Sequence, residues 1–135
     1  MKPRLLLIAI LTGAPMAATA QSFDLVCQGT STTFPPTRPY FKKAFHERLR
    51  INLGTKQFCR GDCSEVRSIF EIAPGRLRLI EDGDKDAGEG LTVNRISGAL
   101  NGIVKRPSAE DELDETFTEA KCVKAKFSGF PRPKF

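Results

Sequence analysis

The sequence predicts an all-β fold: a single antiparallel meander closed into a small barrel, with a sandwich as the alternative, built from about seven or eight strands. Three observations predict it. Several short segments carry apolar residues with a two-residue period, Gly, Pro, Asn and Ser separate these segments, and no segment has a convincing helical period. In addition, a bond between Cys27 and Cys122 would place the first and last strands side by side, as a closed barrel requires.

Residues 1–20 have the features of a cleaved secretory signal peptide. Lys2 and Arg4 precede the apolar run from Leu5 to Leu11, and Ala18-Thr19-Ala20 matches a signal-peptidase site. The apolar run is too short for a transmembrane helix, which needs about 18 apolar residues. We therefore expect a mature domain of residues 21–135 that is periplasmic or secreted and has no transmembrane segment.

All four cysteines lie in the expected mature domain, and an even count in an exported domain indicates disulfides. Cys59 and Cys63 are close enough in sequence to pair through a short loop, which leaves Cys27 for Cys122. In the chain-entropy model the long loop contributes about 4.7 kcal/mol and the short loop about 2 kcal/mol. The bond between the two ends of the domain is therefore expected to stabilise it more.

The first half of the domain begins with an alternating strand in FDLVCQG, residues 23–29. TSTTFPPTRP, residues 30–39, contains three prolines and is expected to be a long loop. AFHERLRINL, residues 44–53, alternates strictly and is the clearest strand, and KQFC follows a turn at Gly54-Thr55. VRSIFEIA, residues 66–73, fits a strand or a helix, and its β-branched residues favour the strand.

The second half of the domain continues the same pattern. GRLRLIED and LTVNRIS predict two strands, and GALNGIVKR predicts a weaker one after a turn at Ser97-Gly98. TFTEAKCVKAKF, residues 116–127, follows the acidic stretch EDELDE and has apolar residues at its odd positions. It is expected to be the last strand.

The Arg-Gly-Asp triplet at residues 60–62 lies between Cys59 and Cys63. A thioredoxin-type redox pair has two intervening residues rather than three. Gly61 and Asp62 are common in tight turns, so a turn closed by a disulfide explains the stretch, with an adhesion ligand and a redox pair as alternatives.

Several short motifs together resemble a group of small exported bacterial β-proteins of uncharacterised function. They are Phe23-x-Leu25-x-Cys27-x-Gly29, the two-cysteine turn, Val93-Asn94-Arg95-x-Ser97-Gly98, and Cys122 followed by FSGFP at residues 127–131. The resemblance implies export and a compact β fold, and it implies no activity.

The sequence does not favour an enzyme, a metal site or a cofactor. His46 is the only histidine, it lies on the polar face of the clearest strand, and no Gly-x-Ser-x-Gly motif supplies a nucleophile. Asp82, Asp84 and Asp86 match the start of an EF-hand loop, but Ala87 and Val93 occupy the positions of its essential glycine and glutamate. A solvated hairpin loop is the better interpretation.

The C-terminal segment is rich in cations and phenylalanines. Lys121, Lys124, Lys126, Arg132 and Lys134 would allow contact with an anionic envelope surface. The favoured alternative is that EDELDE partly compensates the lysines while the phenylalanines pack across the end of the barrel.

The expected function is that of an exported, non-catalytic binding or structural module, whose partner is an envelope component or another protein. Nucleic acid is not an expected partner, because the net charge is only +5, or +3 after loss of Lys2 and Arg4, and because we expect the protein to be exported. The alternative is an inhibitor of a lysozyme-like enzyme, by analogy with small exported β-barrel inhibitors that present a Ser-Gly-x-x-Tyr loop. Here Ser97-Gly98 is followed by Asn101 where the tyrosine would stand.

Overall fold

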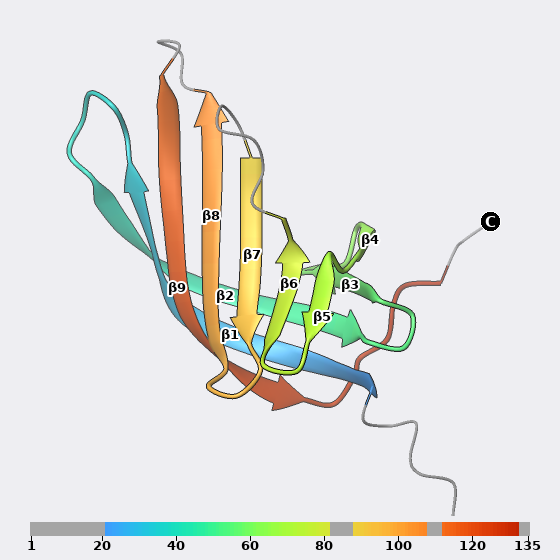
Figure 1. Ribbon diagram of the computed structural model, residues 1–135. Helices are drawn as coiled ribbons and strands as arrows, with labels where there is room; N and C mark the ends of the chain where they lie inside the picture. Colours follow the sequence, from blue (N-terminus) through green and yellow to red (C-terminus); the bar gives the residue numbers. More distant parts are fainter. Residues whose placement is uncertain (1–20, 82–87, 108–111, 133–135) are drawn as a thin grey trace, which may run out of the picture.

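The computed structural model describes residues 21–81, 88–107 and 112–132, which form one antiparallel sheet without a helix in these ranges. The sheet curls into a half-barrel (Figure 1), so the expected all-β, barrel-like fold is confirmed. Its strands are β1 (Ser22–Phe34), β2 (Phe41–Asn52), β3 (Gln57–Arg60), β4 (Val66–Ser68), β5 (Glu71–Ala73), β6 (Arg76–Ile80), β7 (Gly88–Asn94), β8 (Ala99–Pro107) and β9 (Leu113–Ala125).

The first and last strands are neighbours in the middle of the sheet, whose order is β4-β3-β2-β1-β9-β8-β7-β6-β5. Cys27 lies opposite Cys122 in the β1–β9 ladder. The expected neighbour relation of the end strands is therefore present, and the seam of the half-barrel falls instead between β4 and β5.

A single segment, residues 66–73, forms both edges of the sheet. Its first part pairs with β3 and its second part with β6. Between them, the amide of Ile69 donates to the carbonyl of Lys56 at 2.8 Å, and the amide of Phe70 donates to the carbonyl of Leu79 at 3.4 Å. The segment is thus a strand, as favoured, but this change of partner divides it, which gives nine strands rather than seven or eight in the described residues.

The core residues come from the parts of the strands that form the lower half of the curled sheet in the view of Figure 1. Its inner face is made by alternate residues of each strand, as the two-residue period predicts. Phe45 and Leu53 of the clearest strand segment pack against this core. Its fully buried large side chains include Leu49, Ile51, Phe58, Leu77, Leu79 and Leu100.

The first strand is longer than expected, because Thr30–Phe34 continues β1 rather than starting the loop. These residues pair with β2 on one side and β9 on the other, so pairing outweighs the loop-like composition of TSTTF. Asn101-Gly102 likewise lies inside β8, and the turn between β7 and β8 is at Ser97-Gly98.

Four strands extend above most of the core into an upper sheet, and the start of β7 flanks it beside β8. It consists of residues 29–34 of β1, 41–47 of β2, 101–107 of β8 and 113–119 of β9. All four segments are described, and none of their residues is buried. Apart from Phe45 at its lower margin, which packs against the core, the hydrogen-bonded ladders therefore continue above the apolar core.

Candidate binding site

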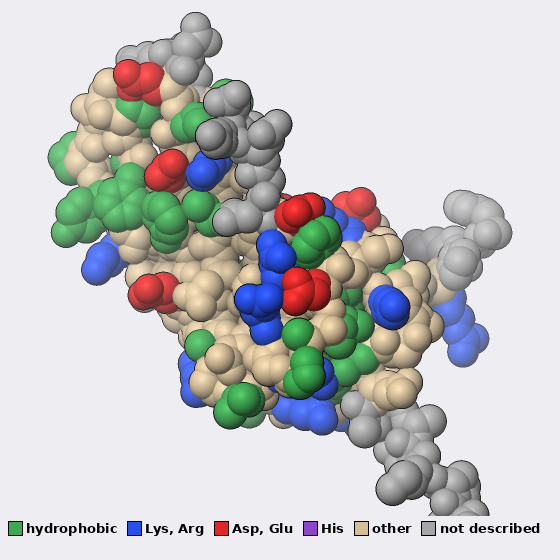
Figure 2. All heavy atoms as spheres, viewed as in Figure 1, with side chains coloured by type: hydrophobic (Ala, Val, Ile, Leu, Met, Phe, Trp, Pro, Cys, Tyr) green, Lys and Arg blue, Asp and Glu red, His purple; other side chains and the backbone are tan. Residues whose placement is uncertain are grey.

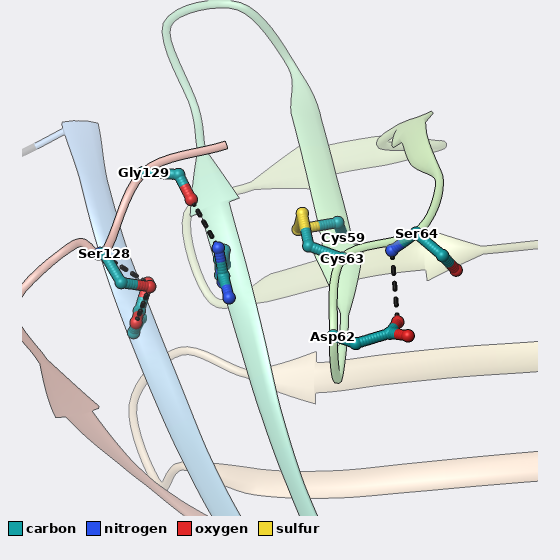
Figure 3. Close-up of a disulfide and its surroundings, with 8 residues drawn as sticks. Cys59, Asp62, Cys63, Ser64, Ser128 and Gly129 are labelled. Carbon is teal, nitrogen blue, oxygen red and sulfur yellow. Dashed lines mark hydrogen bonds between the residues drawn. A yellow bond between two sulfur atoms is a disulfide. The ribbon is translucent and has the colours of Figure 1, made fainter. Parts of the chain in front are cut away.

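Both predicted disulfides are present and have different surroundings. Cys27–Cys122 joins β1 to β9 across a Cα–Cα distance of 4.0 Å and is part of the core. Cys59–Cys63 closes the turn after β3 (Figure 3). No free cysteine is found among the described residues, and two disulfides fit an oxidising environment.

The CRGDC stretch is a disulfide-closed turn. Gly61 has a φ of 55°, and the amide of Cys63 donates to the carbonyl of Arg60 at 2.8 Å. The side chain of Asp62 accepts a hydrogen bond from the amide of Ser64 at 3.1 Å (Figure 3). Every residue of the stretch thus has a role in the turn or beside it.

The side chain of Arg60 lies against the protein, unlike the rest of this turn. Its guanidinium donates to both carboxylate oxygens of Glu47 at 2.8 and 2.9 Å and also pairs with Glu89. Burial alone would lower the pKa of Arg60, but the two carboxylates outweigh it and raise the pKa above its usual value. The side chain of Arg60 is therefore held in a half-buried ion-pair cluster with Glu47 and Glu89.

The turn between β7 and β8 is held rigidly. The side-chain oxygen of Asn94 accepts hydrogen bonds from the amides of Ile96 and Ser97 at 2.9 and 2.8 Å. The carbonyl of Gly98 accepts from the amide of Cys122 at 2.8 Å. Gly98 has a φ of 75°, and a Cβ atom there would lie 2.6 Å from the carbonyl oxygen of Cys122. Only glycine fits this position.

This turn presents a hydrophobic side chain to solvent. Ile96 is 87% exposed at its tip. The neighbouring Arg95 is fixed at both ends, because its amide donates to Gly75 at 3.0 Å and its guanidinium donates to the carbonyl of Ala73 at 2.9 Å. The turn is thus anchored to the β5–β6 hairpin as well as to β9.

A hollow of about 400 Å³ lies between this turn and the lower end of the half-barrel. Its apolar wall comes from Phe23, Leu25, Leu77 and Val93, which belong to three strands, β1, β6 and β7, that the curl of the sheet brings together. Cys122 also lines it. The disulfide therefore fixes one wall of the hollow directly.

Two cations line the polar side of the hollow. Arg95 comes from the rigid turn, and Lys124 comes from β9. The ammonium of Lys124 lies 4.9 Å from the centre of the Phe23 ring. An adjoining hollow of about 370 Å³ shares Phe23 and Lys124 and is also lined by Lys126.

The predicted cationic residues therefore separate into groups. Lys124 and Lys126 lie at the two hollows, while the ammonium of Lys121 donates to the carbonyl of Ser97 in the rigid turn. Arg132 is exposed in the C-terminal segment, and Lys134 lies outside the described residues. The sequence analysis singled out Lys124 and Lys126, but it did not single out Arg95 or the strands that supply the apolar wall.

The C-terminal segment after β9 folds back across the outer face of β1 and β2 (Figure 3). Ser128 donates from its hydroxyl and its amide to the carboxylate of Asp24, at 2.6 and 3.2 Å. Arg50 donates to the carbonyl of Gly129 at 2.8 Å. Phe127 and Phe130 are half-buried, with ring centres 5.4 Å apart. The segment thus follows the outer face of the sheet, whereas the favoured interpretation placed its phenylalanines across the end of the barrel.

Other candidate sites in the sequence are not assembled in the part of the chain described. His46 is exposed on β2. No group of three or more His, Cys, Asp or Glu side chains within residues 21–81, 88–107 and 112–132 is arranged to hold a metal ion. The acidic loop considered for calcium lies largely at residues 82–87, outside the described residues.

In the residues that the structure describes, no helix is both long and apolar enough to cross a membrane. No protein-family model, curated protein or solved structure matches the chain.

Proposed function

We propose that this protein is an exported, non-catalytic binding module for a small anionic ligand that has an apolar part. The observation that carries the proposal is the lower hollow, where an apolar wall from three strands is lined on another side by Arg95 and Lys124. Concave sites with a mostly apolar lining and a few polar groups are the usual form of small-molecule sites, and they occur in the mouths of β-barrels. The lower end of this half-barrel is such a mouth.

The dimensions of the hollow agree with a small ligand. Its volume of about 400 Å³ falls within the range of about 300–1,000 Å³ that is typical of ligand sites. The disulfide at Cys122 and the hydrogen bonds of the β7–β8 turn hold the walls in place, which lowers the entropic cost of binding.

The lining also indicates which part of the ligand goes where. An apolar part would cover the exposed edges of Phe23 and Leu25, while an anionic group would lie next to Arg95 and Lys124. Lys124 lines both adjoining hollows, so its ammonium is available to a ligand in either of them.

Export is part of the same proposal. The signal-like residues 1–20 and the two disulfides support a periplasmic or secreted location. The intact mass of the protein from the producing cell tests it: we expect a chain that begins at Gln21. A chain that retains Leu5 to Leu11 would contradict export by this signal.

The binding proposal is tested by calorimetric titration with three probes that share a ten-carbon chain: decanoate and decyltrimethylammonium below their micelle concentrations, and decanol below its solubility limit. We expect decanoate to bind at least about tenfold more tightly than the cationic probe, a difference of about 1.4 kcal/mol. Lys124→Glu should remove this preference. Lys42→Glu, which makes the same charge change on the exposed start of β2, should retain it.

Two results would overturn the binding proposal. One is the absence of decanoate binding at millimolar concentration. The other is equal loss of the preference in Lys124→Glu and Lys42→Glu, because that would reflect overall charge rather than a site.

An inhibitor of a lysozyme-like enzyme is the second candidate. The β7–β8 turn favours it, since Ser97-Gly98 lies in a rigid turn that exposes Ile96. A pre-organised turn with an apolar tip is suited to enter the cleft of another protein. Asn101, at the place of the expected tyrosine, lies exposed within β8.

A lysozyme-activity assay with the purified, oxidised protein separates these two candidates. Inhibition that is lost in Ile96→Asp and kept in Lys124→Glu would favour the inhibitor. No inhibition at a large molar excess would leave the small-ligand module as the function.

A further inference from the structure

The upper sheet is a single layer. It continues the ladders of β1, β2, β8 and β9 beyond the core, and none of its described residues is buried. Stable domains bury each sheet against at least one further layer, because a sheet with two wet faces has little apolar surface to remove from water. This part of the molecule therefore lacks the covering layer that the lower half has.

The outer face of the upper sheet carries aromatic side chains in mutual contact. The ring centre of Phe34 lies 5.6 Å from that of Tyr40 and 5.9 Å from that of Phe117. All three are exposed, Tyr40 by 61%. Ile103 is the cross-strand neighbour of Phe117 on β8. Figure 2 shows hydrophobic side chains gathered on the part of the molecule where the β1–β2 loop lies.

Charges of opposite sign stand on the two sides of this aromatic cluster. Thr32 of β1 pairs with Lys42 on β2 and with Phe117 on β9, so Lys42 lies in the same row as the cluster. Glu119 lies two residues beyond Phe117 on the same face, between Thr30 and Asn101. Within the described residues, neither Lys42 nor Glu119 forms an ion pair.

We propose that the outer face of the upper sheet binds the same face of a second copy of this chain, forming a two-fold dimer. A two-fold axis makes each contact twice, so Lys42 of one copy meets Glu119 of the other while the aromatic clusters cover each other. The apolar centre and charged margins then match those of a protein–protein interface.

The arrangement of charges favours a second copy over an anionic membrane. A bilayer would attract Lys42 and Lys105 but would repel Glu119 and Glu115, which lie on the same face. A face with both signs beside one apolar cluster is instead complementary to itself. The dimer is independent of the proposed ligand site, which lies at the opposite end of the strands.

The experiment is sedimentation velocity on the mature, oxidised protein from micromolar to millimolar concentration. We expect the wild type to move from monomer to dimer as its concentration rises. Lys42→Glu should weaken the dimer at least about tenfold through like-charge repulsion. The double variant Lys42→Glu with Glu119→Lys should restore it, because the exchange of charges recreates the pair.

Two matched controls come from neighbouring residues on the inner face. Lys43→Glu makes the same charge change one residue away, and Phe41→Ser removes an equally exposed phenylalanine for comparison with Phe117→Ser. Both controls should leave the dimer unchanged, while Phe117→Ser should weaken it. A wild type that remains monomeric at millimolar concentration would overturn the proposal. So would a dimer that Lys43→Glu weakens as much as Lys42→Glu does.

Discussion

Asp24 is a carboxylate buried under the C-terminal segment. Its side chain has no exposed surface and accepts hydrogen bonds from Ser128 and, at 2.5 Å, from Arg48. Burial by itself would raise the pKa of Asp24, but the bonds from Ser128 and Arg48 outweigh it, so the pKa lies below its usual value. The folded protein therefore stabilises the charged form of this residue.

This lowered pKa predicts how stability depends on pH. The contribution of Asp24 is complete above the unfolded-state pKa of about 4 and is lost as the pH falls through the lower folded-state pKa. Asp24→Asn should cost about 1–3 kcal/mol at neutral pH, and less in strong acid. Urea unfolding at several pH values measures this, with the exposed Glu65→Gln as a control. A cost that does not change with pH would contradict the role of the charge.

The CRGDC turn contains Arg60, which is half-buried, and Asp62, which is exposed. Substitutions of these two residues should therefore have unequal effects on stability. Arg60→Ala would leave Glu47 and Glu89 facing each other half-buried and should cost about 1–3 kcal/mol. Asp62→Ala removes a hydrogen bond from an exposed turn and should change the free energy of unfolding by no more than about 0.5 kcal/mol. Thermal unfolding of both variants is the measurement, and an equal effect would contradict the internal position of Arg60.

At the scale of elements, β9 shows how much the sequence could predict. Its alternation identified a strand correctly, but the apolar odd positions do not face the core. Cys122 bonds Cys27 inside the half-barrel and so turns the even positions inward, which leaves Phe117 and Val123 exposed. Alternation alone gives two faces, and a long-range contact decides which face is buried.

The two disulfides predict different losses of stability when each is replaced as a pair by serines. Cys27–Cys122 spans 95 residues of sequence and Cys59–Cys63 spans 4. The chain-entropy model gives about 4.7 kcal/mol for the first and about 2 kcal/mol for the second. Chemical unfolding of the two double variants checks this order. A larger loss from the short loop would show that the turn stabilises the fold by its packing.

At the scale of the whole molecule, the sequence indicated the kind of sheet but not the place where its two edges meet. The period of each strand predicted an antiparallel fold, and the cysteines predicted that β1 and β9 are neighbours. The seam lies where the amide of Ile69 donates to Lys56 and the amide of Phe70 donates to Leu79. These two acceptors are far apart in the sequence. Such pairings follow from the curl of the complete sheet, which no local pattern specifies.

The two halves of the sheet should differ in their protection from hydrogen exchange. The lower half has the core and the Cys27–Cys122 bond, while the upper sheet has ladders without buried side chains. We expect peptides from residues 29–34 and 113–119 to exchange faster than those from 49–52 and 76–80 in dilute protein, because uncovered segments open locally at low cost. At high concentration a dimer would slow exchange in the upper sheet alone, and Lys42→Glu should abolish this gain. Uniform protection in both halves at low concentration would show that the upper sheet is stable as a single layer.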